Sequence, residues 1–255
     1  NLDGTNIYMT MAAMFVARRF GVPLVLDYRD EWTECPFEFV QKDGADRAWE
    51  RRCLKNADAV QFTTESHLRH QIAPFPELDP RKAHVVSNGW DPDEFVDRSS
   101  EHAAEKHVDG SVLRIAYLGS LAGQTPPRDF LESLQQLLTD HPEWIARIRV
   151  SFVGRRGPSA AEAIRAFKFP SVLEVVDPVS KREAISRMRE SDVLLLIARP
   201  GLERYLPAKI FEYLAARRPV LVFGSRGEPS ALIDELGAGV YCPAGSAAAL
   251  GDALE

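Results

Sequence analysis

Residues 198–224 have the sequence ARPGLERYLPAKIFEYLAARRPVLVFG, in which an apolar strand passes through a loop into a helix and then into a second strand. Pro207 stands where a first helical position is expected, because its fixed φ and missing N–H cost nothing there. The flanking runs VLLLI (193–197) and VLVF (220–223) do not alternate between apolar and polar residues. Strands that helices cover on both faces have this pattern. The stretch therefore predicts a helix that begins at Pro207 and connects two parallel strands.

The same alternation of short apolar runs and helical periods continues through most of the chain. It predicts an α/β fold with two doubly wound, Rossmann-like domains built on parallel sheets. The strands are expected at Leu24–Tyr28, Ala59–Thr63, His84–Ser87, Leu113–Leu118, Arg149–Val153, Leu173–Val176, Val193–Ile197, Val220–Phe223 and Val240–Cys242.

A polar stretch, Val96–Gly110, separates the two series and predicts a domain boundary, with domains at residues 1–100 and 111–255. The first domain has too few strands for an ordinary open sheet, so we expect its beginning to be missing; a naturally small domain is the alternative. The chain opens on a helical pattern, Ile7–Phe15, without an initiator Met, which favours an internal helix. It stops on a helix, so a truncated C-terminus is also expected.

Composition excludes several classes of protein. The formal net charge of −6 makes nucleic acid an unfavourable partner, so any bound phosphate needs a local site. No apolar run approaches the ~20 residues of a membrane span. The 3 scattered cysteines support neither a disulfide framework nor a zinc knuckle and favour a reducing cytoplasm. No histidines are paired at metal-ligand spacing, and His67 and His70 are expected on an exposed helix face.

The helix expected at Pro207 carries the residues most informative about chemistry. Its first amides and its dipole suit a phosphate, and Lys209 in the first turn can reach the same anion. Glu212 follows about one turn later, where a carboxylate can accept two hydroxyls of a ribose. The alternative is an ordinary solvated pair between Lys209 and Glu212.

The segment PAKIFEYLAARRPVL (207–221) resembles the signature of the retaining GT-B glycosyltransferases of family 4, whose usual form is P-S-K-hydrophobic-x-E-Y-L-A-x-x-x-P-V, with Ala208 in place of Ser. Further motifs of that family are similar to LDYRDEW (26–32), ADAVQFTTE (57–65), HVVSNGWDPDEF (84–95) and IAYLGSLAG (115–123). The resemblance covers most of residues 24–250.

The resemblance implies that the C-terminal domain binds a nucleoside-diphosphate sugar. Gly119 and Ser120 would approach the diphosphate, since a Cβ at the glycine would hold the backbone away. Lys209 would bind phosphate, Glu212 the ribose, and the loop from Asp177 to Val179 the base. No metal and no cofactor are expected.

Two departures from the family pattern concern charged residues. Ser120 and Gln124 stand where the family often has Arg and Lys, and Arg204 stands where the first Glu of an E-x7-E pattern is usual. Arg199 or Arg204 is the candidate to restore the lost cation as a donor-binding residue.

The resemblance places the acceptor on the N-terminal domain. Asp30 and Arg29 are the candidate catalytic residues: Asp30 is the candidate polar group, and Asp27 or Arg29 would orient the substrate. A helix cap or a turn is the alternative role for Asp30. Trp32 and Asn88 are candidate acceptor-side residues, with core packing and a tight turn as their respective alternatives.

The implied function is transfer of a sugar, with retention and without a metal, from a nucleotide donor to an acceptor. A hexosyltransferase-type enzyme is expected, with UDP favoured over GDP, and with a glycan, lipid-linked or small-molecule acceptor. A peripheral membrane contact through a missing N-terminal region stays open. The alternatives are a nucleotide-sugar epimerase on the same fold and a catalytically silent nucleotide-sugar-binding subunit. A NAD-dependent enzyme is disfavoured because no GxGxxG fingerprint is present.

Overall fold

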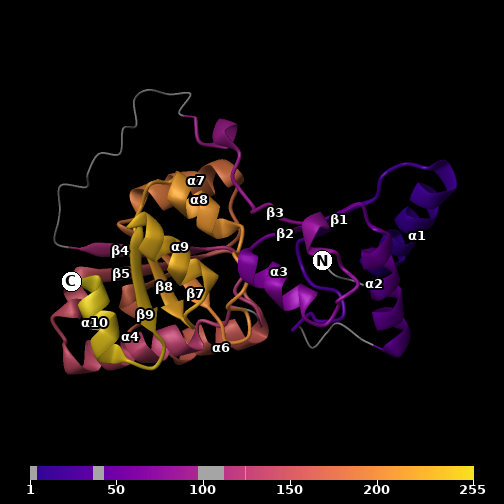
Figure 1. Cartoon of the computed structure of the whole chain (residues 1–255). Coiled ribbons are helices and arrows are strands. Elements are labelled where there is room, and N and C mark those ends of the chain that lie inside the picture. The colour runs from indigo at the N-terminus through magenta and orange to yellow at the C-terminus, as the bar shows by residue number, and fades with distance from the viewer. Residues whose placement is uncertain (1–4, 37–42, 97–111, 124) are drawn as a thin grey trace. The chain divides into compact units, whose positions relative to one another are not determined.

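The computed structural model describes residues 5–36, 43–96, 112–123 and 125–255. Its backbone separates into two compact units, and each is described by itself (Figure 1). Unit 1 comprises residues 1–88 together with Arg204–Leu206, and unit 2 comprises Gly89–Glu203 and Pro207–Glu255. The division thus falls before the predicted linker, most of which lies outside the described residues.

Unit 1 is a small parallel sheet with helices. The strands have the order β1-β2-β3, and both pairings are parallel. The elements are α1 (Thr5–Phe20), β1 (Val25–Tyr28), α2 (Gly44–Asn56), β2 (Ala59–Phe62), α3 (Glu65–Ile72), a 3-10 turn (Pro80–Lys82) and β3 (Ala83–Val85).

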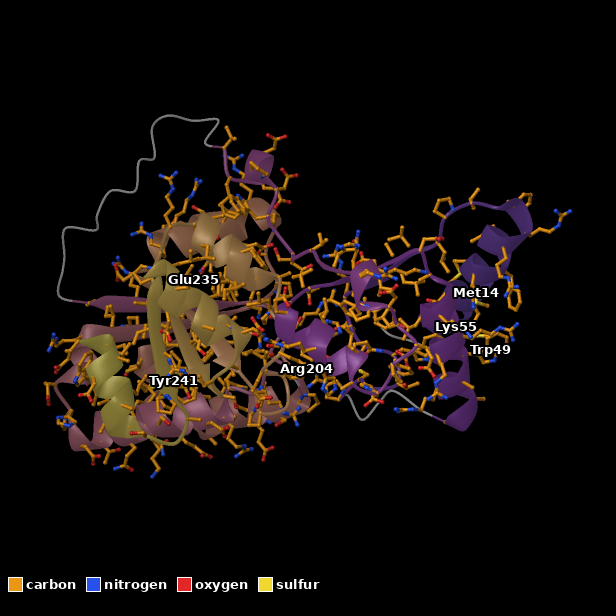
Figure 2. All side chains as sticks on the ribbon, in the orientation of Figure 1. Met14, Trp49, Lys55, Arg204, Glu235 and Tyr241 are labelled. Carbon is orange, nitrogen blue, oxygen red and sulfur yellow. The ribbon has the colours of Figure 1, made fainter. Side chains whose placement is uncertain are left out.

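Local capping fixes where two helices of unit 1 begin. The Asp43 side chain accepts from the backbone amide of Asp46, and the Asp46 side chain accepts from the backbone amide of Asp43. These two hydrogen bonds form a capping box for α2. Thr64 caps α3 through the amide of His67. Helices α1 and α2 pack together, with Met14 fully buried and Trp49 at the edge of the core, both labelled in Figure 2.

Unit 2 has a six-stranded, fully parallel sheet in the order β6-β5-β4-β7-β8-β9. This is the order of a doubly wound Rossmann sheet, with β4 and β7 at the point where the order reverses. Its elements are η2 (Pro92–Glu94), β4 (Leu113–Leu118), α4 (Arg128–Asp140), α5 (Trp144–Arg147), β5 (Ile148–Val153), α6 (Pro158–Ala166), η3 (Pro170–Val172), β6 (Leu173–Val176), α7 (Lys181–Glu190), β7 (Val193–Ala198), α8 (Lys209–Ala215), β8 (Val220–Gly224), α9 (Glu228–Leu236), β9 (Gly239–Pro243) and α10 (Ala247–Leu254).

Helices cover both faces of this sheet. Figure 1 shows α4, α6 and α10 on one face and α7 and α8 on the other. The continuous apolar strands β7 and β8 are accordingly buried along nearly their whole length. Edge-to-face contacts of Phe130 with Phe152 and Phe223 fill the layer between α4 and the sheet. The sequence-based prediction of an α/β fold with doubly wound parallel sheets is confirmed.

One predicted helix boundary is wrong. Helix α8 begins at Lys209, two residues after Pro207. Ala208 already has helical φ and ψ, and the Pro207 carbonyl accepts from the Ile210 amide. Pro207 and Ala208 therefore form a turn that leads into the helix. Ala208 lacks the hydroxyl that would cap the helix there. None of the described helices combines the length and apolarity that crossing a bilayer requires.

Candidate functional site

The carboxyl ends of β4 and β7 bring the predicted phosphate-binding residues of unit 2 together. Gly119 follows β4, with φ of +127°, a conformation that favours glycine. A Cβ built on Gly119 would lie 2.9 Å from the Lys209 Nζ, so the ammonium lies directly over the bare Cα. Residues 90 positions apart in sequence therefore meet at the sheet edge where doubly wound folds bind ligands.

A buried tyrosine of β4 orders this region, and sequence reasoning missed it. Tyr117 is fully buried; its hydroxyl accepts from Lys209 Nζ at 2.6 Å and donates to the Ser120 carbonyl at 2.9 Å. Thr125 donates to the same carbonyl at 2.8 Å. The sequence feature that could have pointed to Tyr117 is its position two residues before Gly119. A tyrosine in a strand is, however, equally typical of core packing.

Lys209 carries an unneutralised charge in a desolvated place. Burial lowers its pKa from 10.5 to about 8, and the Glu212 charge opposes this shift. Within the described residues no carboxylate pairs with it at ion-pair distance; its polar partner is the neutral Tyr117 oxygen. A desolvated cation beside a glycine is an arrangement that an anion stabilises.

Glu212 pairs with a different lysine from the one that the alternative reading of the sequence suggested. Its carboxylate accepts from Lys181 Nζ at 2.5 Å, and the same ammonium lies 3.1 Å from Glu94. Lys181 begins α7, directly after the loop predicted to hold the base. Glu212 is thus tied to that loop's end.

Two further loops of unit 2 are held by arginines. Arg199, at the end of β7, donates to the carbonyl of Gly123 at 2.5 Å, so it joins the β4 loop. Arg156 donates to Asp177 and to the Val176 carbonyl, which fixes the start of the loop that contains the half-buried Val179. Gln124 lies outside the described residues.

The predicted acceptor-side residues lie at the end of β1 in unit 1. Arg29 donates to Asp27 at 2.9 Å and to the Asn88 side-chain oxygen at 2.6 Å, and all three side chains form one network. Asp30 is half-buried, and burial raises its pKa. Trp32 is buried in the core of unit 1, and its assignment to the acceptor side stays a prediction.

Arg204 lies in a charge cluster of unit 1 (labelled in Figure 2). Its guanidinium donates to both oxygens of Glu31, at 2.6 and 2.5 Å, and the Tyr205 hydroxyl donates to the same carboxylate at 2.7 Å. Glu31 is fully buried. The guanidinium predicted to contact the donor is therefore paired with a carboxylate in this structure, and its contact with the donor stays a prediction.

The prediction that His67 is exposed is wrong. The residue is fully buried, with Nε2 3.8 Å from Glu31, and burial lowers its pKa from 6.5 to about 4. His67 and Gln71 share the buried face of α3 because they are one turn apart. His70, which also lies 3.8 Å from Glu31, is 42% exposed.

Among the described residues, no group of three or more His, Cys, Asp or Glu side chains is arranged to hold a metal ion.

Unit 2 therefore has a doubly wound α/β fold with Gly119 and Lys209 in contact at the point where its strand order reverses. Comparison with family models identifies the family. Residues 113–255 match the model described as "Glycosyl transferases group 1", and residues 4–89 match the "Glycosyl transferase 4-like domain". Because the first match covers more than half of the chain, the chain belongs to the group 1 glycosyl transferases.

Solved structures show the same GT-B fold. The Anabaena protein Alr3699/HepE in complex with UDP has a TM-score of 0.72 at 13% identity, over 96% of this chain and 65% of that chain. The trehalose-phosphate synthase (UDP-forming) from Burkholderia vietnamiensis has a TM-score of 0.67 at 14% identity, over 94% of this chain and 61% of that one.

The sucrose-phosphate synthase of Thermosynechococcus elongatus has a TM-score of 0.65 at 14% identity, over 96% of this chain and 66% of that one. The chain therefore spans between 61% and 66% of the length of these three solved structures. A search of curated proteins gave no match.

Proposed function

We propose that the chain takes part in transfer of a sugar from a nucleoside-diphosphate sugar to an acceptor, with retention and without a metal. Family membership supports the class of reaction. The observation that carries the proposal is the Lys209 ammonium, which lies over Gly119 and has a neutral oxygen as its partner. A diphosphate at this point would supply the missing negative charge.

UDP is the nucleotide that we propose first. The Anabaena structure is described as a complex with UDP, and the Burkholderia synthase as UDP-forming. In this chain, Gly119, Ser120 and Lys209 would take the diphosphate, with Arg199 at the rim of the β4 loop. Glu212 would accept from the ribose, and the loop ending at Val179 would lie against the base.

The proposed chemistry asks little of ionisable side chains. The acceptor oxygen attacks the anomeric carbon on the face that the diphosphate leaves, the carbon–oxygen bond to phosphate breaks, and the acceptor proton passes to the departing phosphate oxygen. Lys209 stabilises the negative charge that develops on that phosphate, as a metal would elsewhere. Asp30, beside the Arg29–Asp27–Asn88 network, is the group that we propose to orient the acceptor.

We further propose a hexose as the transferred sugar and the cytoplasm as the compartment. The side chains of Cys35, Cys53 and Cys242 are buried thiols, which suits a reducing environment.

A ligand screen followed by a turnover assay tests the proposal. A thermal-shift series with UDP, GDP, ADP and dTDP should single out one nucleotide, because a ligand at 100 times its Kd stabilises by about 2.7 kcal/mol. The selected nucleotide is then supplied as its glucose conjugate, with and without EDTA, and with glucose as an acceptor. Nucleotide release that persists in EDTA supports the metal-free transferase. Epimerised donor without nucleotide release would favour the epimerase, and tight binding without turnover the silent subunit.

A further inference from the structure

Tyr117 has a hydroxyl that packing alone does not explain. The residue lies on β4, at the centre of the six-stranded sheet, and its ring packs against Phe152 with a centroid separation of 6.3 Å. A phenylalanine would fill the same apolar space. The hydroxyl, however, forms hydrogen bonds with two polar groups at the carboxyl edge of the sheet, the Ser120 carbonyl and the Lys209 ammonium.

The directions of these hydrogen bonds are fixed by chemistry. A carbonyl oxygen only accepts, so the single phenol proton goes to Ser120, and an ammonium only donates, so Lys209 donates to the phenol oxygen. One of the three N–H groups of Lys209 is used in this way. Its other N–H groups have no partner among the described side chains and backbone atoms, and the ammonium is held over Gly119.

We propose that Tyr117 is a positioning residue for the diphosphate site: its hydroxyl holds the Lys209 ammonium over Gly119 and ties it to the Ser120 carbonyl of the glycine loop. The inference rests on the proposed function and adds to it the residue that aims the cation. Because Tyr117 is fully buried, it would act through Lys209 and not by touching the nucleotide.

A residue that positions Lys209 for an anion must itself be uncharged. Burial raises the pKa of Tyr117 to about 12, so the phenol stays uncharged wherever the protein functions. A carboxylate at the same position would neutralise Lys209 and compete with the ligand. A phenol oxygen orients the ammonium and leaves its positive charge available to an anion.

The experiment compares Tyr117→Phe with the wild-type protein by isothermal titration with UDP across pH 7–10. The matched control is Tyr241→Phe, which also removes a phenol bond to a backbone carbonyl, that of Gly224 at 3.0 Å, but has no contact with Lys209 (Tyr241 is labelled in Figure 2). Tyr117→Phe should raise the Kd for UDP about tenfold, as expected for loss of a hydrogen bond to a charged group, whereas the control should change it less than about twofold.

The pH profile separates positioning from simple structural support. In wild-type protein, UDP affinity should fall as Lys209 deprotonates above pH 8. Without the phenol oxygen the charged form loses an acceptor, so the fall in affinity should begin at lower pH in Tyr117→Phe. Two results for Tyr117→Phe would overturn the inference: an unchanged Kd for UDP, or a higher Kd whose dependence on pH has the same midpoint as in wild type.

A second measurement needs no ligand. NMR titration of lysine labelled with ¹³C at Cε, with the Lys209 signal assigned from its absence in Lys209→Met, should give a lower pKa in Tyr117→Phe than in wild type. If wild-type protein binds none of UDP, GDP, ADP and dTDP, the proposed function fails on that result, while this titration still decides whether Tyr117 holds Lys209. Equal pKa values in the two proteins would refute the contact.

Discussion

The Arg204 cluster of unit 1 and the Lys209 cluster of unit 2 both pair a cation with a tyrosine, but only the first contains a carboxylate that neutralises the cation. Each places a cation against a tyrosine ring, with Arg204 5.0 Å from the Tyr205 centroid and Lys209 4.0 Å from that of Tyr117. In unit 1, the tyrosine and the arginine both donate to the buried Glu31, so the cluster is neutral and closed. In unit 2, the tyrosine donates to a backbone carbonyl.

The difference distinguishes a structural cation from a ligand-binding one. Glu31 compensates the desolvation of Arg204 within the protein, so removing either partner should cost stability. Nothing charged compensates Lys209 at ion-pair distance within the described residues, so its removal should cost binding and spare stability.

The largest expected effect is on Glu31. Glu31→Gln leaves the Arg204 guanidinium, which is only 17% exposed, without its counter-charge, and should lower the free energy of unfolding by about 3–5 kcal/mol. Urea denaturation followed by fluorescence measures the loss. The control is Glu77→Gln, which breaks the half-exposed pair with Arg51 and should cost less than about 1 kcal/mol. Equal losses of unfolding free energy in Glu31→Gln and Glu77→Gln would show that the buried pair is no more important for stability than an exposed one.

Acid should weaken the same cluster through His67. Its pKa in the folded protein is about 4, below the ordinary 6.5, so the unfolded chain binds the additional proton between these values. The contribution is therefore complete above pH 6.5 and is lost as the pH falls towards 4, by an amount on the order of 3 kcal/mol. Stability curves for wild type and His67→Gln should converge over this window, and parallel curves would show that His67 is not the group responsible.

The smallest expected change in stability is at Lys209. Lys209→Met removes a desolvated charge and should leave the free energy of unfolding at pH 7 unchanged or raise it by up to about 1 kcal/mol. Because the folded pKa of Lys209 is about 8 and the ordinary value is 10.5, wild-type stability should rise relative to the variant between these pH values. Chemical denaturation at pH 7 and pH 10 measures both differences. A large loss at pH 7 would make Lys209 a structural cation like Arg204.

Sequence patterns predicted the parts of this molecule that depend on neighbouring residues. Short apolar runs located every described strand to within two residues, and the uninterrupted runs of β7 and β8 reflect burial on both faces. The resemblance implied that Gly119, which follows β4, and Lys209, which begins α8, lie at the same phosphate, and the structure brings the two residues together. The exact start of α8 did not, since a helical turn after Pro207 satisfies the same rules.

The missed features depend on contacts distant in sequence. Glu31 and Arg204 are separated by 173 positions, and nothing near either residue indicates the other. Tyr117 has the pattern of a core residue, and only its hydroxyl partners give it a further role. His67 was misplaced because two polar residues, His67 and Gln71, make the buried face of α3, so hydropathy indicates the wrong side.

Isothermal titration of UDP into wild-type protein and Lys209→Met at pH 7 tests the central claim most directly. If the Lys209 ammonium is the cation that a diphosphate neutralises, the variant should bind UDP about 10- to 100-fold more weakly, in line with loss of a charge-assisted hydrogen bond. Identical Kd values in the two proteins would contradict the account.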